Sequence, residues 1–293
     1  MVGSIPIVDF EVGDLHIRRV PETLLTSFTP ETLLPGWASG VADAQLQALQ
    51  PDHVAPSGHL ILSTHAWLVR TGKYQVLVDT GIGNDKTRPT PLFHQLQTDF
   101  LSNLRQAQAS PDDIDFVLLT HLHTDHVGWN TQLVNGQWVP TFRNARYVFS
   151  RREYDVLSAQ ARAGTDRRGF FEDSVQPIVA AGQALPVEAS EQILDGVTLH
   201  PTPGHSVDHW SIGMVSRGET ALFAGDVMHH PIQVDQTQLN SVFCAAPDAA
   251  RRSRLWALQY AEETNALFCS SHFAGRSAGR IRRADGGFRW QSA

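Results

Sequence analysis

Short apolar runs and stretches of helical periodicity alternate along this chain. The runs at 75–79 and 115–120 are continuous, and each ends in a polar or glycine-containing segment, which is typical of buried strands. Between them, apolar residues recur at helical spacing from Leu92, which predicts a helix to about Ala107. The same patterns predict further strands at 197–201, 210–215, 220–224 and 266–271, and a helix at 248–263 introduced by Pro247.

Strands that alternate with helices indicate a layered α/β fold. The 293 residues include 42 % hydrophobic residues, enough for a substantial core, and no repeat or interdomain linker stands out. We therefore expect a single domain over residues 1–293. Within it, residues 1–59 form an N-terminal extension that can contribute to a substrate pocket.

The run HLHTDH, residues 121–126, directly follows a predicted buried strand. Side chains alternate along a strand, so His121 and His123 should point to one side, and a tight turn can bring Asp125 and His126 to the same point. Imidazole and carboxylate groups suit zinc, manganese or iron. The alternative is a polar surface cluster, which four ligand-type residues in six positions make the weaker interpretation.

Three more ligand-type residues follow predicted strands: His205, Asp226 and His272. Any one of them alone would more often be a capping or internally bonded residue. Loops at strand ends are, however, where functional groups converge in layered α/β folds. Their joint occurrence with the 121–126 run therefore favours one metal site.

The run THLHTDHVG, followed in order by PGH, GD and SHF, resembles the metallo-β-lactamase superfamily from about Leu60 to Arg283. The resemblance implies a four-layer αββα metallo-β-lactamase sandwich with two metal ions in a groove at one sheet edge. It implies these ligands: His121, His123 and His205 for one ion, Asp125, His126 and His272 for the other, and Asp226 bridging both. Asp79, in the segment LVDTG, would orient a ligand rather than bind metal.

The implied chemistry is hydrolysis by a hydroxide shared between two divalent ions, most typically Zn²⁺, with Mn or Fe as alternatives. Asp125 then takes part in catalysis as a ligand. The residue at position 123 is a histidine, whereas related oxygen-reducing di-iron proteins resemble an HxExDH pattern, and this difference favours hydrolysis.

Within the superfamily, the segments HLHTDHVGWN and GDVMHHPIQV resemble the branch that contains N-acyl-homoserine lactonases and methyl parathion hydrolase. Those lactonases carry a tyrosine three residues after the bridging aspartate, where this chain has His229. The histidine is closer to the organophosphate-hydrolase pattern. We expect His229 to donate a hydrogen bond to the oxyanion or leaving group, or else to pack against the groove wall. Its neighbour His230 should point away, and His209 should give support.

Aromatic residues concentrate in the first sixty residues and at 154–181, among prolines and glycines. They are Phe28, Trp37, Tyr154, Phe170 and Phe171. They could line an apolar pocket over the metal site, which would favour an uncharged, partly apolar small-molecule substrate, or they could form a satellite core.

The net charge of −7 argues against nucleic acid as the main partner. No apolar run approaches the ~20 residues that span a bilayer, so we expect no membrane insertion. The N-terminus does not resemble a secretory signal, which predicts a cytoplasmic location. A homodimer is implied by the resemblance alone.

The leading hypothesis is thus a dinuclear metal-dependent hydrolase of small ester or lactone bonds. Phosphotriester hydrolysis is the alternative within enzymes, since the same nucleophile serves both reactions. A glyoxalase II-like enzyme is less favoured, because the tail after His272 does not resemble that family's helical domain. Outside enzymes, the alternative is a non-catalytic ligand-binding protein on the same fold.

Overall fold

The computed structural model describes residues 5–37, 43–166, 169–284 and 286–293. Contacts divide the chain into two compact units, each with one large mixed sheet. We call residues 5–23 and 64–191 the seven-strand unit, and residues 24–63 and 192–293 the six-strand unit. The chain passes between them inside strands β2 and β3 and again after residue 191. The single domain expected over residues 1–293 stays a prediction.

The sheet of the seven-strand unit has the order β1-β2-β3-β4-β5-β8-β9. Its strands are β1 (Val8–Val12), β2 (Leu15–Phe28), β3 (Leu60–Arg70), β4 (Gln75–Val78), β5 (Phe116–Leu118), β8 (Arg146–Ser150) and β9 (Ala184–Val187), and β6 (Thr131–Val134) pairs separately with β7 (Gln137–Pro140). Its helices are α3 (Phe100–Gln106), α4 (Arg151–Arg162), α5 (Gln176–Ala180), a π-helix at Phe171–Val175 and 3₁₀ turns at Pro91–Phe93, Pro111–Asp113 and Gly128–Asn130.

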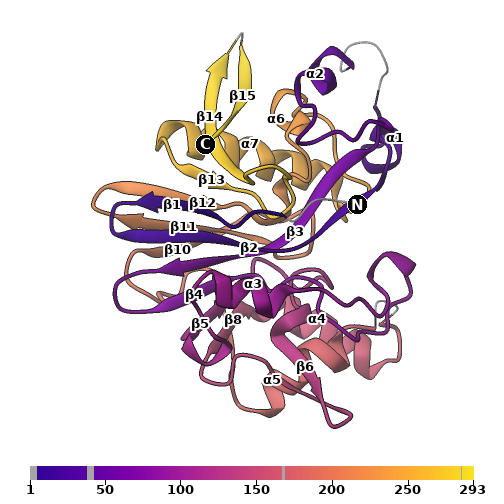
Figure 1. The fold of residues 1–293 in the computed structure, drawn as a ribbon, viewed down its shortest axis with the longest axis vertical. Coiled ribbons are helices and arrows are strands. Elements are labelled where there is room, and N and C mark those ends of the chain that lie inside the picture. Colours follow the sequence, from indigo (N-terminus) through magenta and orange to yellow (C-terminus); the bar gives the residue numbers. More distant parts are fainter. Residues whose placement is uncertain (1–4, 38–42, 167–168, 285) are drawn as a thin grey trace. The chain divides into compact units, whose positions relative to one another are not determined.

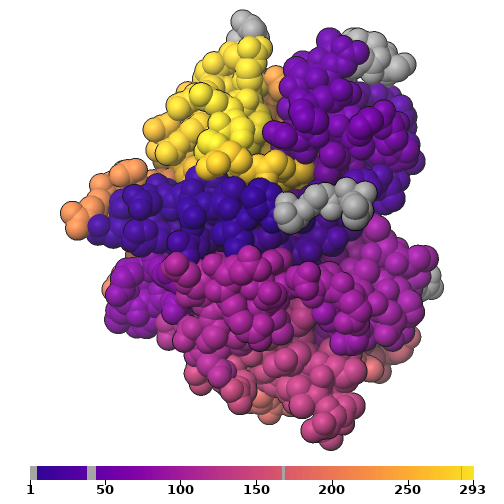
Figure 2. All heavy atoms as spheres, in the orientation of Figure 1, coloured from indigo at the N-terminus to yellow at the C-terminus, as the bar shows by residue number. Residues whose placement is uncertain are grey.

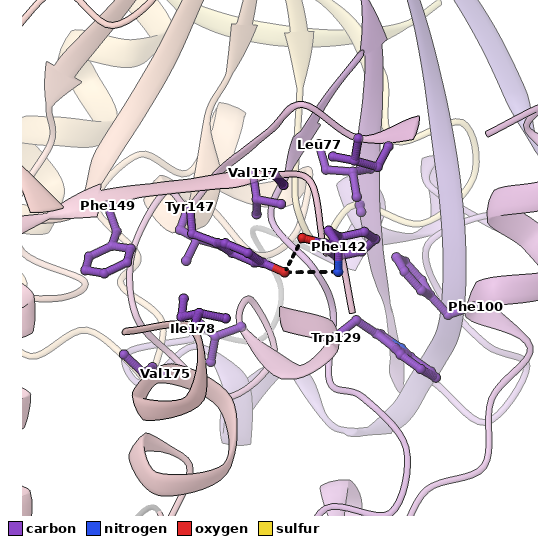
Figure 3. Packing of buried hydrophobic residues seen from close by; sticks show 14 of the residues in the cluster. Leu77, Phe100, Val117, Trp129, Phe142, Tyr147, Phe149, Val175 and Ile178 are labelled. Atoms are coloured by element: carbon purple, nitrogen blue, oxygen red, sulfur yellow. Dashed lines mark hydrogen bonds between the residues drawn. The ribbon is translucent and has the colours of Figure 1, made fainter. Parts of the chain in front are cut away.

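The core of this unit forms where the parallel strands β4, β5 and β8 meet the helices. Leu77 and Val117 pack with Phe100 of α3, and all three are fully buried. The Tyr147 hydroxyl lies in this core and accepts a hydrogen bond from the Phe142 backbone N–H at 3.1 Å (Figure 3). It also donates to the Asn130 carbonyl at 3.1 Å. Burial raises the pKa of this phenol. The phenol therefore stays neutral and bonded, as a buried polar group must.

The sheet of the six-strand unit has the order β10-β11-β12-β13-β14-β15. Its strands are β10 (Val197–Pro201), β11 (Trp210–Ser216), β12 (Glu219–Phe223), β13 (Leu267–Cys269), β14 (Ala278–Ala284) and β15 (Gly287–Ser292), and its helices are α1 (Pro30–Leu33), α2 (Asp43–Ala48), α6 (Ile232–Asp235), α7 (Pro247–Glu263) and a 3₁₀ turn at Gly225–Val227.

Helix α7 covers part of this second sheet (Figure 1). Its residues Ala257 and Leu258 are fully buried in one cluster with Leu222 of β12 and Phe268 of β13. The two strands are parallel and pair these last two residues directly. The predicted strands and the predicted helix of this unit are therefore confirmed, with Pro247 in the first turn of α7. The layered α/β class is also confirmed.

The helix predicted from Leu92 to about Ala107 is wrong in its first half. The chain makes only a 3₁₀ turn there, and α3 begins at Phe100. Gln95 lies between them with a φ of 51°, in the left-handed region that a right-handed helix cannot contain. Its backbone N–H donates to the Lys86 carbonyl at 2.8 Å, which folds the segment back as a loop.

The hairpin of β1 and β2 was not predicted. In β2 the buried residues Leu15, Ile17 and Arg19 alternate with more exposed ones, which is a strand pattern, but a buried arginine disguises it. The indigo side chains of this hairpin lie on the face of the molecule seen in Figure 2. Among the residues that the structure describes, no helix has the length and apolar character needed to cross a membrane.

Candidate metal centre

The HLHTDH run lies in a loop of the seven-strand unit. Strand β5 ends at Leu118, so His121 and His123 lie beyond the strand. The expectation that strand alternation aligns these two histidines is therefore wrong. A turn aligns them instead, closed by a 3.0 Å hydrogen bond from the His126 N–H to the His123 carbonyl. The ring centroid of His121 lies 4.4 Å from that of His123 and 4.1 Å from that of His126. Three imidazoles of the motif therefore converge.

Asp79 fixes this loop from the end of β4. One of its carboxylate oxygens accepts the Thr120 backbone N–H at 2.8 Å. The other lies 2.8 Å from Nδ1 of His126. A carboxylate on one ring nitrogen fixes the tautomer and makes the other nitrogen the better metal ligand. These bonds agree with the orienting role expected for Asp79.

A glycine-rich turn, residues 80–83, is tied to the far side of the loop. Thr80 donates its backbone N–H to the His126 carbonyl, and Gly128 donates to the Gly81 carbonyl, each at 2.8 Å. A Cβ atom at Gly128 would collide with the Ile82 carbonyl. Only glycine permits this close approach of the two backbones.

Glu22 of β2 supports the same turn and was missed at the sequence level. Its buried carboxylate accepts the backbone N–H groups of Ile82 at 2.6 Å and Gly83 at 3.0 Å, and the Trp129 indole N–H at 2.8 Å. Burial raises its pKa, and these hydrogen bonds oppose the rise. A lone glutamate in an apolar stretch carries no sequence signal of this role.

Glu153 supports the loop from the first turn of α4. Its carboxylate accepts the Leu122 backbone N–H at 2.7 Å, between the first two histidines of the motif. Ser150 caps the same helix by accepting the Glu153 N–H at 3.1 Å. The S-x-x-E pattern at 150–153 is a capping-box signature, so this helix start could have been predicted.

A second cluster lies in the six-strand unit, around Asp226 in the turn after β12. The Nε2 atoms of His205 and His229 each lie 3.2 Å from Oδ2 of Asp226. Nε2 of His272 lies 3.1 Å from Oδ1. All four residues are at most 3 % exposed. The structure thus brings together three predicted ligands of this unit and adds His229, whose ring stacks on that of His272 at 5.1 Å.

Further hydrogen bonds hold this second cluster in place. The backbone N–H of Asp226 donates to Nε2 of His209 at 2.8 Å. Nδ1 of His209 lies 2.8 Å from the Thr202 hydroxyl. Nδ1 of His272 lies 3.1 Å from the Ser63 carbonyl. These contacts agree with the supporting role expected for His209.

His230 points away from the cluster, as expected. Its Nε2 lies 2.9 Å from the backbone carbonyl of His53, and the two rings meet edge to face at 5.9 Å. Burial lowers the pKa of His230 to about 3 and that of His53 to about 4. Both rings are therefore neutral over the physiological pH range.

The aromatic residues divide between the two interpretations. Phe170 and Phe171 are buried in the main core of the seven-strand unit, with Tyr154 packed against it, so these three are core residues, although this core is the main one and not a satellite. In the six-strand unit, Phe28 meets Phe243 edge to face at 5.7 Å, and Phe243 lies 5.6 Å from the ring of His229. Trp37 lines a separate cavity of about 460 Å³ with Leu46 and Val54.

The donor sets fit divalent metal ions. The Nε2 atoms of His205 and His272 lie 3.2 Å and 3.1 Å from the carboxylate oxygens of Asp226, which is the spacing expected of atoms that share an ion. Buried imidazole nitrogens and carboxylate oxygens are the donors that zinc, manganese and iron accept. A buried carboxylate facing three imidazoles is costly unless a cation or protons balance it.

Known proteins share this sequence pattern and this fold. A family profile described as the metallo-beta-lactamase superfamily matches residues 61–272, well over half of the chain. An N-acyl homoserine lactonase of Bacillus thuringiensis is 26 % identical over 171 residues, which cover 54 % of this chain and 61 % of that protein. The first curated relatives are matched over only 46 % to 61 % of their own length.

Solved structures match over nearly the whole chain. A hydrolase named AbOPH, described as a beta lactamase superfamily member, has a TM-score of 0.83 at 23 % identity, covering 99 % of this chain and 98 % of its own. AidC, described as a dizinc quorum-quenching lactonase in complex with a product, has a TM-score of 0.77 at 20 % identity, covering 98 % and 97 %. At such identities the likeness shows the fold alone, with two mixed sheets flanked by helices.

Proposed function

The chain belongs to the metallo-beta-lactamase superfamily, and from this premise we propose that it is a metal-dependent hydrolase of small ester or lactone bonds. The observation that carries the proposal is the approach of three buried imidazole nitrogens to within 3.2 Å of the Asp226 carboxylate. The hydrolase class agrees with the descriptions of AbOPH and AidC.

We assign the ligands as the motif order of the family implies. By this order, His121, His123 and His205 would hold one ion, Asp125, His126 and His272 would hold a second, and Asp226 would be the shared ligand. Zinc is the first choice, since the AidC relative is described as dizinc. When bound, two such ions lower the pKa of a water molecule and polarise the substrate oxygen under attack.

The residues around the ligands prepare the site before substrate arrives. Asp79 holds the ring of His126 through Nδ1, and His209 holds the backbone of Asp226. Ligand side chains that are already held in position lose little conformational freedom when the reaction takes place. Their interactions can therefore stabilise the transition state without first having to be ordered. The exposed ring of Phe243 lies beside His229 and meets the half-buried Phe28, and this aromatic pair favours an uncharged, partly apolar substrate. Homodimer formation and a cytoplasmic location stay predictions.

The test of the function is metal analysis of the purified protein together with turnover of lactones, aryl esters and phosphotriesters. We expect about two ions per chain, hydrolysis that chelation abolishes, and recovery when zinc is added back. The preferred class of substrate then separates ester or lactone cleavage from phosphotriester cleavage. Phosphotriester cleavage is the second candidate function, and the histidine at position 229 favours it. Tight binding of panel members without turnover would instead indicate a ligand-binding protein.

His229 is proposed to donate a hydrogen bond to the developing oxyanion or the leaving group. The change His229→Phe keeps a ring against Phe243 and removes both nitrogens. We expect kcat to fall about 100-fold, with metal content and KM nearly unchanged. Steady-state kinetics and metal analysis check this, with the exposed His16→Phe as control. Loss of metal in parallel with activity would make His229 a ligand and refute the donor role.

A further inference from the structure

A buried ionic cluster of Lys86, Arg88 and Asp173 lies beside the metal-binding loop of the seven-strand unit. The Arg88 guanidinium binds the Asp173 carboxylate with both ends, Nη1 to Oδ2 at 2.6 Å and Nη2 to Oδ1 at 2.8 Å. Its third nitrogen, Nε, donates to the Thr124 hydroxyl at 2.8 Å. Thr124 stands between His123 and Asp125 in the sequence. The Arg88 side chain therefore joins the ionic cluster to the turn of the HLHTDH motif.

The other end of the connection is the π-helix at Phe171–Val175, which contains Asp173. Arg88 also donates to the Gly169 carbonyl at 3.1 Å and to the Ser174 hydroxyl at 3.2 Å. The Arg88 side chain is 1 % exposed. Its hydrogen bonds therefore have little competition from water, and losing one leaves a buried charge poorly paired.

Lys86 holds the same segment from a second direction. Its ammonium donates to the Asp173 backbone carbonyl at 3.1 Å and to the Thr131 hydroxyl at 2.6 Å, and lies 3.6 Å from the centre of the Trp138 ring. Asp173 is thus fixed through its backbone by Lys86 and through its carboxylate by Arg88. Helical turns of the π type are rare and are frequently found at functional sites.

We propose that Arg88 is a positioning residue that couples the metal-binding turn at Thr124 to the π-helix at Phe171–Val175. The inference rests on the metal site of the proposed function. Holding the Thr124 side chain restricts the turn that carries His123 and Asp125, so less conformational freedom is lost when they bind an ion. By thermodynamic linkage, binding of the ion must then stabilise the π-helix by the same factor.

The first experiment measures zinc affinity of the full chain by competition with a chromophoric chelator. Thr124→Val is close to isosteric and removes only the hydroxyl acceptor, whereas Thr124→Ser retains it. We expect Thr124→Val to weaken zinc binding about tenfold or more, and Thr124→Ser to stay within about twofold of the unchanged protein. The exposed pair of Asp112 and Arg143 gives a matched control, since Asp112→Asn should leave zinc affinity unchanged.

A double-mutant cycle tests whether the effect passes through Arg88. Asp173→Asn removes the charge that orients the guanidinium and does not touch the motif, yet it should weaken zinc binding comparably. Because both changes act through one side chain, the double variant should be no weaker than the more affected single variant. Independent, multiplicative losses would overturn the coupling, as would an effect of Thr124→Val that Thr124→Ser fails to rescue.

Hydrogen exchange gives a readout that does not depend on activity. Zinc should slow exchange of the backbone amides at 170–176 in the unchanged protein, and Thr124→Val should remove most of that protection while global unfolding stays the same. If the exchange rates of the amides at 170–176 are the same with and without zinc, the inference is overturned. Zinc binding and coupling without hydrolysis of any ester, lactone or phosphotriester refute the proposed activity alone, and failure of the unchanged protein to bind zinc refutes both.

Discussion

Replacing Asp226 by asparagine is expected to reduce turnover by at least about a thousandfold and to lower the metal content below two ions per chain. Three imidazole Nε2 atoms face this carboxylate at 3.1–3.2 Å inside the protein. Asparagine keeps the shape but removes the negative charge. It also presents an NH₂ group where an ion would need an acceptor.

The measurements are kcat on the best substrate, elemental analysis and the free energy of unfolding. Asp248→Asn, at the exposed first turn of α7 in the same unit, serves as the control and should retain activity and metal. The metal-depleted Asp226→Asn protein should remain folded, because removing a buried charge relieves a desolvation cost. Full metal content with unchanged kcat would contradict the assignment of Asp226 as a shared ligand.

Replacing Lys86 by methionine is expected to change how stability depends on pH. Burial lowers the pKa of Lys86 to about 7, against the opposing effect of Asp173, from an ordinary 10.5. Between these two values the unfolded chain binds more protons than the folded one, so the free energy of unfolding rises with pH. Each pH unit in that window is worth about 1.4 kcal/mol, and the whole window is of order 5 kcal/mol.

Urea unfolding from pH 6 to pH 10 checks this expectation. The difference in unfolding free energy between the unchanged protein and Lys86→Met should be constant below about pH 7. It should then grow in favour of the unchanged protein as the buried ammonium loses its proton. Lys73 is exposed, and Lys73→Met serves as the control for removing a lysine side chain. Parallel curves for both variants would show that Lys86 keeps an ordinary pKa.

Sequence patterns predicted the parts of the fold that repeat a simple period. The parallel strands β4 and β5 are continuous apolar runs because both faces are covered, and such runs are easy to recognise. The metal motif was equally recognisable, since several ligand-type residues fall within six positions. The geometry was less accessible. His121 and His123 converge through a turn closed at His126 rather than through strand alternation.

The residues missed are those whose partners lie far away in the chain. Glu22 binds a turn sixty positions later, and Arg88 binds Asp173 eighty-five positions later. No local period reports such contacts, because they depend on the tertiary fold. The false helix at Leu92 has a related cause, since the left-handed conformation of Gln95 is maintained by a bond to the Lys86 carbonyl. A local pattern of apolar residues does not reveal this hydrogen bond, which forms in place of a helical one.

The division of the chain also affects the order in which a nascent chain can fold. The seven-strand unit is complete once residue 191 has left the ribosome, and domains generally fold as units during synthesis. Residues 24–63, in contrast, belong to the six-strand unit and are made well before residues 192–293. Leu33, for example, bonds through its carbonyl to the backbone of Val242. This early segment must therefore wait through the synthesis of residues 64–191 before the rest of its unit begins to be made.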